Sequence, residues 1–97
     1  MKIYVAGKIS GLPRNEVEAK FEQARKRLVE NGHSVFVPTV LPDYADVPHS
    51  DYLRICYAMI DVCDAVYVLK DWKDSNGARL ELNYAKCNGK EVMYEEK

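Results

Sequence analysis

The sequence predicts an α/β domain with a parallel sheet, and two observations support this prediction. Short apolar runs rich in Val, Ile and Tyr alternate with longer segments in which apolar residues recur every three or four positions. Gly, Pro or Asn separates consecutive segments, as expected for turns between strands and helices. Strands that alternate with helices favour a parallel sheet with right-handed crossovers. We expect residues 1–97 to form a single domain, since 97 residues suffice for one core.

The first half of the chain contains two predicted strands and one helix. Lys2–Ala6 is the first strand, and the loop Gly7–Pro13 follows it. The first helix is expected to use Asn15 as its N-cap and to end at Asn31-Gly32. The apolar stripe of this helix consists of Val17, Phe21, Ala24 and Leu28. Ser34–Val37 is the second strand, which a proline stops.

A long irregular connection, residues 39–49, leads to the second predicted helix. Tyr44 in this connection is either a base-stacking residue or an ordinary surface tyrosine. Ser50 is the expected N-cap of the helix. Its apolar stripe consists of Leu53, Cys56, Tyr57, Ile60 and Cys63.

The last third of the chain repeats the strand–loop–helix order. Val66–Leu69 is the third predicted strand, and the polar loop Lys70–Ser75 follows it. A helical pattern then runs from Asn76 to the stop signal Asn88-Gly89. Glu91–Tyr94 is the fourth strand.

We expect the strand order 2-1-3-4, in a three-layer arrangement of the flavodoxin-like or Rossmann-like type. Strands 1 and 3 are then neighbours whose helices leave on opposite faces of the sheet. The loops Gly7–Pro13 and Lys70–Asn76 would face each other across one crevice at the carboxyl edge of the sheet. This crevice is the predicted binding site.

The third helix contains one acidic residue where an apolar one is expected. On a helical wheel that starts at Ala78, Glu81 falls near the middle of the apolar arc. The apolar members of this arc are Leu80, Tyr84 and Cys87 on one side and Ala78, Leu82 and Ala85 on the adjoining side. A buried carboxylate is costly unless it is paired or used. Glu81 is therefore either a buried residue paired with a neighbour or a functional carboxylate.

The loop after the first strand is a second candidate for function. Gly7, Lys8 and Ser10 suggest a loop that exposes backbone N–H groups to an anionic ligand. The loop has neither the Walker A pattern nor the Gly-x-Gly-x-x-Gly pattern. A plain surface turn would use the same residue types, so both interpretations remain open here.

Charge and cysteine content restrict the function classes. Fourteen basic and fifteen acidic residues give no general electrostatic attraction to nucleic acid or membrane, and no apolar run has bilayer length. Cys56, Cys63 and Cys87 have no Cys-x-x-Cys spacing, and we expect them to be small core residues of a reduced, cytoplasmic protein. His33 and His49 show no ligand spacing to them, so neither a metal nor another cofactor is predicted.

Four segments together match a known family. They are Ile3–Gly7, Gly32–Pro38, Cys63–Val66 and Trp72–Glu81. The last is the most specific, because Glu81 follows Gly77 by four residues and Ser75 by six. On these segments, which span nearly the whole chain, the sequence resembles the nucleoside 2-deoxyribosyltransferase superfamily, which includes 2′-deoxynucleoside 5′-phosphate N-hydrolases. More narrowly, it is similar to a short bacterial and phage branch of that group.

The resemblance implies cleavage of an N-glycosidic bond or transfer of a deoxyribosyl group. Glu81 would be the nucleophile that attacks the anomeric carbon, and Tyr4 would hydrogen-bond to it and orient it. Ser75 matches the Ser of the relatives that act on nucleoside monophosphates, and Gly77 would let the backbone approach a phosphate. The implied partner is thus a small-molecule nucleoside or nucleotide.

The first loop would complete the phosphate site. Lys8 and Ser10 are the candidates there, with Arg14 as a further one, and Gly7 precedes them. The relatives also form dimers or larger assemblies. We therefore expect a homodimer or higher homo-oligomer, which Leu80, Tyr84 and Cys87 would mediate unless the second helix covers them.

The chain departs from the family pattern at Lys8, where the relatives often have Pro or Ser, and at a second position that matters more for the chemistry. The enzymes carry an Asp eight residues before the Asp that opens the third strand, and this Asp assists departure of the base. Counting back from Asp64 places Cys56 there, and a thiol is a poor acid for this step. The departure keeps two alternatives open, a non-catalytic module that binds a nucleotide or phosphosugar and a structural interaction domain.

Overall fold

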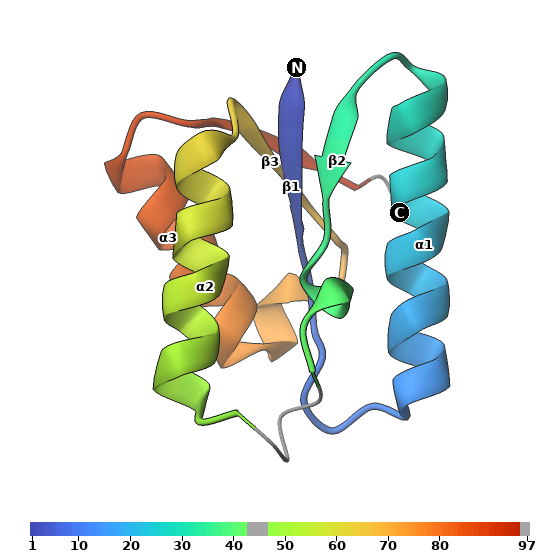
Figure 1. Cartoon of the computed structure of the whole chain (residues 1–97), viewed down its shortest axis with the longest axis vertical. Coiled ribbons are helices and arrows are strands. Elements are labelled where there is room, and N and C mark those ends of the chain that lie inside the picture. The colour runs from blue at the N-terminus through green and yellow to red at the C-terminus, as the bar shows by residue number, and fades with distance from the viewer. Residues whose placement is uncertain (43–46, 96–97) are drawn as a thin grey trace.

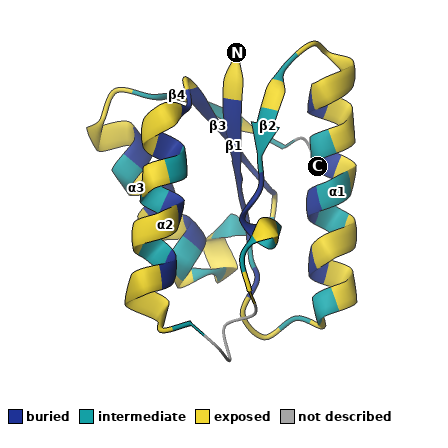
Figure 2. Ribbon diagram, viewed as in Figure 1, coloured by how far each residue is buried: buried dark blue, intermediate teal, exposed yellow. Residues whose placement is uncertain are grey.

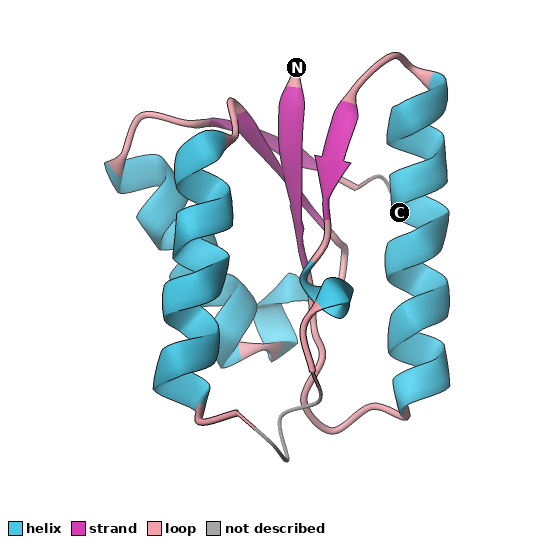
Figure 3. Cartoon of the chain, in the orientation of Figure 1, coloured by secondary structure: helices cyan, strands magenta, loops and turns pink. Residues whose placement is uncertain are grey.

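The computed structural model describes residues 1–42 and 47–95 (Figures 1 and 3). Along the chain the elements are β1 (Lys2–Ala6), α1 (Arg14–Glu30), β2 (Ser34–Phe36), the 3₁₀ turn η1 (Pro38–Val40), α2 (His49–Val62), β3 (Ala65–Val68), the 3₁₀ turn η3 (Trp72–Asp74), α3 (Asn76–Cys87) and β4 (Glu91–Tyr94). Tyr44, the predicted stacking candidate, lies outside the described residues.

The described strands form one parallel sheet of four strands in the order β2-β1-β3-β4, which confirms the predicted topology. Tyr4 of β1 pairs with Phe36 of β2 on one side and with Val66 of β3 on the other. Helix α1 covers one face of the sheet, and α2 and α3 cover the other (Figure 1). The helices that follow β1 and β3 therefore lie on opposite faces, and a crevice is expected between the two loops that lead to them.

The core is built around the two central strands (Figure 2). Ile3–Ala6 of β1 and Ala65–Val68 of β3 are buried along their whole length. Such continuous apolar runs are typical of parallel strands with helices on both faces. The predicted stripe of α1 faces this core, since its buried residues are Val17, Phe21, Ala24 and Leu28.

Both predicted N-caps were wrong. Helix α1 follows Pro13 and α2 follows Pro48, so Asn15 and Ser50 each fall in the first turn of their helix. Neither prolyl cap position has a side-chain hydrogen bond. The fixed φ of proline suits a residue just before a helix, and this backbone preference outweighs the capping signal one or two positions later.

Several strand and loop boundaries differ by about one residue from those predicted. β2 ends at Phe36 because the chain turns into η1 at Pro38. β3 is shifted by one residue to Ala65–Val68, although the backbone N–H of Leu69 still donates to Ala6 at 2.8 Å. The predicted loop after β3 contains the turn η3.

Helix α3 packs with a narrower face than its apolar arc suggested. Its buried residues are Ala78, Glu81, Leu82 and Ala85. Cys87 is exposed, so the prediction of a core position was wrong for it, whereas Cys56 and Cys63 are buried as expected. The apolar arc is wider than the area that the sheet and α2 together cover.

The side of α3 proposed for self-association is partly covered by α2. Tyr84 is half-buried and stacks on Tyr57 of α2 with 4.2 Å between ring centroids. Leu80 is 45% exposed and Cys87 is also exposed. The homo-oligomer stays a prediction. None of the described helices is long and apolar enough to cross a membrane.

Gly7 is a packing requirement at the end of β1. A Cβ added there would lie 2.6 Å from Cδ1 and 3.0 Å from Cβ of Leu69. We predict that Gly7→Ala lowers the free energy of unfolding by about 1–3 kcal/mol, because the core must shift to admit the methyl group.

Urea unfolding of the wild type and of Gly7→Ala measures this effect. Gly77→Ala is the matched control, because the nearest atoms to a Cβ at Gly77 are 3.9 Å away. Equal unfolding midpoints for Gly7→Ala and the wild type would contradict the packing argument.

Candidate functional site

A buried tyrosine–glutamate pair lies at the centre of the site. Tyr4 of β1 has no exposed surface, and Glu81 of α3 is only 5% exposed. The Tyr4 hydroxyl donates a hydrogen bond of 2.6 Å to Oε2 of Glu81. Glu81 is the one buried charged side chain among the described residues. The sequence prediction that Glu81 lies on the buried side of α3 is therefore confirmed.

Helix α2 adds a third group to this pair. Cys56 is fully buried, and its thiol hydrogen-bonds with both Glu81 and Tyr4. The carboxylate of Glu81 thus has donors from β1 and from α2 while it is carried by α3. The three elements meet at one polar point inside an otherwise apolar core.

Burial determines the protonation of this triad. It raises the pKa of Glu81 to about 7, although the hydrogen bonds from Tyr4 and Cys56 favour the carboxylate and act in the opposite direction. Burial also raises the pKa of the Tyr4 hydroxyl well above its ordinary value, and the nearby charge of Glu81 raises it further. Burial, followed by the charge of Glu81, raises the pKa of the Cys56 thiol in the same way. Tyr4 and Cys56 therefore stay protonated as donors, and Glu81 is the member that changes charge near neutral pH.

A polar pocket of about 270 Å³ lies at the N-terminus of α3. Its lining residues are Lys8, Ser10, His49, Asp74, Ser75, Asn76 and Gly77. Four of the sequence-predicted binding residues, Lys8, Ser10, Ser75 and Gly77, are thus brought together from two loops. Gly7 does not line this pocket, because it is buried against Leu69.

Ser75 has a structural role that the sequence analysis missed. Its hydroxyl oxygen accepts a hydrogen bond of 3.1 Å from the backbone N–H of Ala78, so Ser75 is the N-cap of α3. An oxygen that accepts this bond still has its own proton to donate to an anion. The backbone of Gly77 in the first turn carries no side chain, although there is room for one. This end of α3 therefore combines a hydroxyl donor with bare backbone at the positive end of the helix dipole.

A second, wider pocket of about 650 Å³ adjoins the first. It is lined by His49, Asn76, Arg79, Leu80 and Asn83, and the first two residues also line the first pocket. Neither His49 nor Asn76 was predicted from the sequence as a pocket residue. Their position in the sequence could have indicated the pocket, since each of the two residues begins a helix at the carboxyl edge of the sheet.

The two loops of the crevice are tied together, as the topology predicted. The backbone N–H of Lys8 donates to Oδ1 of Asp71 at 3.1 Å, and Lys20 of α1 forms an ion pair with the same carboxylate. Asp71 follows β3, whereas Lys8 follows β1. This carboxylate therefore fixes the spacing of the loops that carry the pocket residues.

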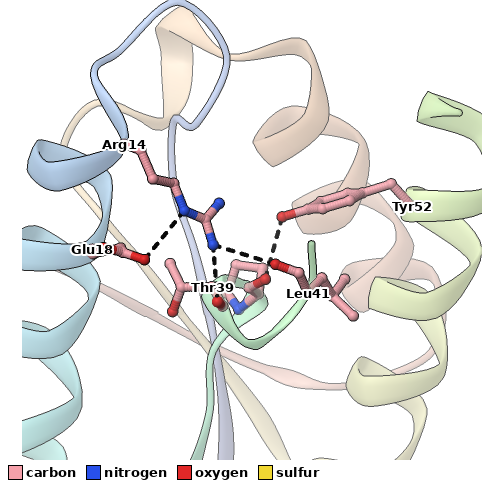
Figure 4. A network of polar contacts seen from close by, with 6 residues as sticks. Arg14, Glu18, Thr39, Leu41 and Tyr52 are labelled. Carbon is pink, nitrogen blue, oxygen red and sulfur yellow. Dashed lines mark hydrogen bonds and ion pairs between the residues drawn. The ribbon is translucent and has the colours of Figure 1, made fainter. Parts of the chain in front are cut away.

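Arg14 holds the segment after β2 instead of lining the pocket (Figure 4). Its Nη2 donates to the carbonyl oxygens of Thr39 and Leu41 at 3.0 and 3.2 Å, and its Nε contacts Glu18. Tyr52 of α2 approaches from the other side and donates to the carbonyl of Pro38. These bonds connect α1, η1 and α2.

No group of three or more His, Cys, Asp or Glu side chains in the described residues is arranged to hold a metal ion.

Comparison with family models matches residues 1–94 to one family, described as a domain of unknown function (DUF4406). The chain belongs to the DUF4406 family. A search of curated proteins gave no match. Among solved structures, the chain is similar to a 2-desoxiribosyltransferase from Leishmania mexicana, with a TM-score of 0.73 and 25% sequence identity. The match covers 96% of this chain and 62% of that one. The fold of this DUF4406 chain is therefore nucleoside 2-deoxyribosyltransferase-like, as the sequence resemblance implied.

The burial of Glu81 has a consequence for stability. The pKa of Glu81 is raised from an ordinary value of 4.5 to about 7, so the folded chain holds this proton more tightly than the unfolded chain. The stabilisation by the bound proton is fully present below about pH 4.5 and is lost as the pH rises through 7. We predict a loss of roughly 3 kcal/mol across this window from Glu81 alone.

Urea unfolding at several pH values between 4.5 and 8 tests this. Glu81→Gln keeps an acceptor for Tyr4 and cannot ionise. The free energy of unfolding of the wild type should therefore fall relative to that of Glu81→Gln as the pH rises. Parallel stability curves for the two proteins would show that Glu81 does not titrate in this range.

Proposed function

We propose that the chain cleaves the N-glycosidic bond of a nucleoside or nucleotide, by hydrolysis or by deoxyribosyl transfer, with Glu81 as the nucleophile. The preferred ligand is a (deoxy)nucleoside 5′-monophosphate. The observation that supports this proposal best is the buried Tyr4–Glu81 hydrogen bond one helical turn from a polar pocket on the same helix. The similarity to a 2-desoxiribosyltransferase agrees with it.

The spacing along α3 suits such a ligand. Gly77 and Glu81 are four residues apart, which is about 6 Å along the helix axis and places both on similar faces. A phosphate bound by Ser75, Gly77, Lys8 and Ser10 would direct the attached sugar along α3 toward Glu81. The Ser75 hydroxyl and the bare backbone of Gly77 would offer hydrogen-bond donors to a phosphate, whereas a carboxylate at position 75 would repel it.

The reaction needs an ionised carboxylate close to the anomeric carbon. Glu81 would attack this carbon, forming a C–O bond as the C–N bond to the base breaks and the base leaves with the bonding electrons. Water or a second base then displaces Glu81, and the two displacements together retain the configuration of the sugar. Tyr4 would hold Glu81 in position without competing as an acid, because its hydroxyl is hard to ionise.

A second candidate is a module that binds the same ligand without turnover. Cys56 favours this candidate, because a buried thiol with a raised pKa is a poor proton donor for the departing base. Calorimetry with deoxynucleoside 5′-monophosphates separates the two candidates. Binding without release of free base supports the module, whereas continuous release of base supports the enzyme.

We predict that Glu81→Gln lowers the rate of base release by at least roughly 1,000-fold while the nucleotide still binds, because only the nucleophile is removed. The measurement is chromatographic detection of free base from a panel of deoxynucleoside and ribonucleoside monophosphates. Asp61→Asn, on an exposed residue of α2, is the control and should retain wild-type rates. Equal base release by wild type and Glu81→Gln would end the proposal that Glu81 is the nucleophile.

The pH dependence of the reaction tests the role of Tyr4. Because the carboxylate is the reactive form, base release should increase as the pH rises through about 7. Tyr4→Phe removes a hydrogen bond that stabilises the carboxylate, so the pKa of Glu81 rises and the pH–rate curve moves to higher pH. An unchanged curve for Tyr4→Phe would show that this bond does not control ionisation of Glu81.

A further inference from the structure

His49 occupies a position between the two pockets. It is the first residue of α2 and lines both the pocket at the start of α3 and the wider one beside it. Its Cε1 atom lies 3.9 Å from the position that a Cβ would take at Gly77. The imidazole therefore stands directly beside the backbone that the proposed function assigns to a phosphate.

The geometry of α2 places His49 at the phosphate end of the site and not at the sugar end. Cys56 follows His49 by seven residues, close to two helical turns, so both lie on the same face of α2 about 10 Å apart along its axis. Cys56 interacts with Glu81, whereas the His49 ring lies beside Gly77 in the first turn of α3. On α2, His49 lies beside the pocket and Cys56 lies beside Glu81. On α3, Gly77 lines the pocket and Glu81 is buried, so both helices run from the pocket into the core.

The charge of the first pocket depends on His49. Lys8 and Asp74 contribute opposite charges to its lining and cancel each other. The remaining titratable side chain of that lining is His49, so the side-chain charge is near zero with a neutral imidazole and positive with an imidazolium. Arg79 in the adjoining pocket is a further charged group facing His49. The N-termini of α2 and α3 both meet the pocket and add positive potential.

We propose that His49 is a specificity residue for the phosphate, which it binds as an imidazolium, so that anion binding takes up one proton from solvent. This inference rests on the phosphate-binding half of the proposed function and not on its chemistry. It makes the chain favour phosphorylated over free nucleosides most strongly at mildly acidic pH.

Inorganic sulfate is the probe for the first experiment, because it keeps its double negative charge throughout the range from pH 5.5 to 8. We expect the wild type to bind sulfate about tenfold more tightly at pH 5.5 than at pH 8, since one added charge at contact distance contributes on that scale. By linkage, sulfate should move the titration midpoint of the His49 imidazole protons to higher pH in NMR spectra.

The chain provides its own control in its second histidine. His33 lies close to the amino group of Met1, with Nδ1 at 3.1 Å, at the opposite end of β1 from the pocket. The His33 resonances should not respond to sulfate, and His33→Gln should bind sulfate like the wild type. Because Glu81 also changes charge between these pH values, the effect of His49 is measured in the Glu81→Gln background. Adding His49→Gln to Glu81→Gln should make sulfate affinity equal at both pH values.

The outcomes separate this inference from the proposed reaction. Sulfate binding that depends on pH through His49, in a chain that releases no base, supports the inference and removes the reaction. Base release in a chain that binds no sulfate, or whose sulfate affinity keeps its pH dependence when His49→Gln is added to Glu81→Gln, overturns the inference and leaves the reaction standing. The wild-type NMR titration decides the matter even when a variant does not fold.

Discussion

One buried, hydrogen-bonded Glu side chain constrains how three elements of the fold pack together. A carboxylate inside an apolar core is costly unless donors reach it, and here the donors come from two other elements, β1 through Tyr4 and α2 through Cys56. Among the described residues no buried side-chain polar atom lacks a hydrogen-bond partner. The relative positions of β1, α2 and α3 are therefore constrained by a polar contact as well as by packing. Displacing any of the three elements would leave a buried polar group without its partner.

The sheet order places this buried point beneath an open one. Because β1 and β3 are adjacent and their helices lie on opposite faces, the loops after them meet at the carboxyl edge, where Asp71 ties them together. Helix α3 starts in this crevice at its N-cap Ser75 and carries Glu81 into the core one turn after Gly77. The N-terminus of α3 thus lies in the crevice, while Glu81 of the same helix lies in the core.

The sequence was sufficient where a local pattern determined the structure. The apolar runs predicted the strands β1 and β3, and the periodicity of α3 predicted the burial of Glu81, because such patterns fix which face is inside. The helix starts were wrong, because Pro13 and Pro48 act through backbone geometry that competes with the capping signal of Asn15 and Ser50. His49 was missed as a pocket residue for a different reason. Its role depends on the position of α2 relative to α3, and no local pattern contains that information.

The proposed reaction needs a proton donor for the departing base as well as a nucleophile. A base that leaves the sugar as a neutral molecule needs a proton, and the buried donors Tyr4 and Cys56 both hold theirs firmly because burial disfavours their anions. Glu81 cannot supply the proton and attack the sugar at the same time. In the described part of the chain, the side chains able to deliver a proton from the solvent side are those of the two pockets. The proposed reaction must therefore draw its proton from the crevice and its nucleophile from the core, on opposite sides of the sugar.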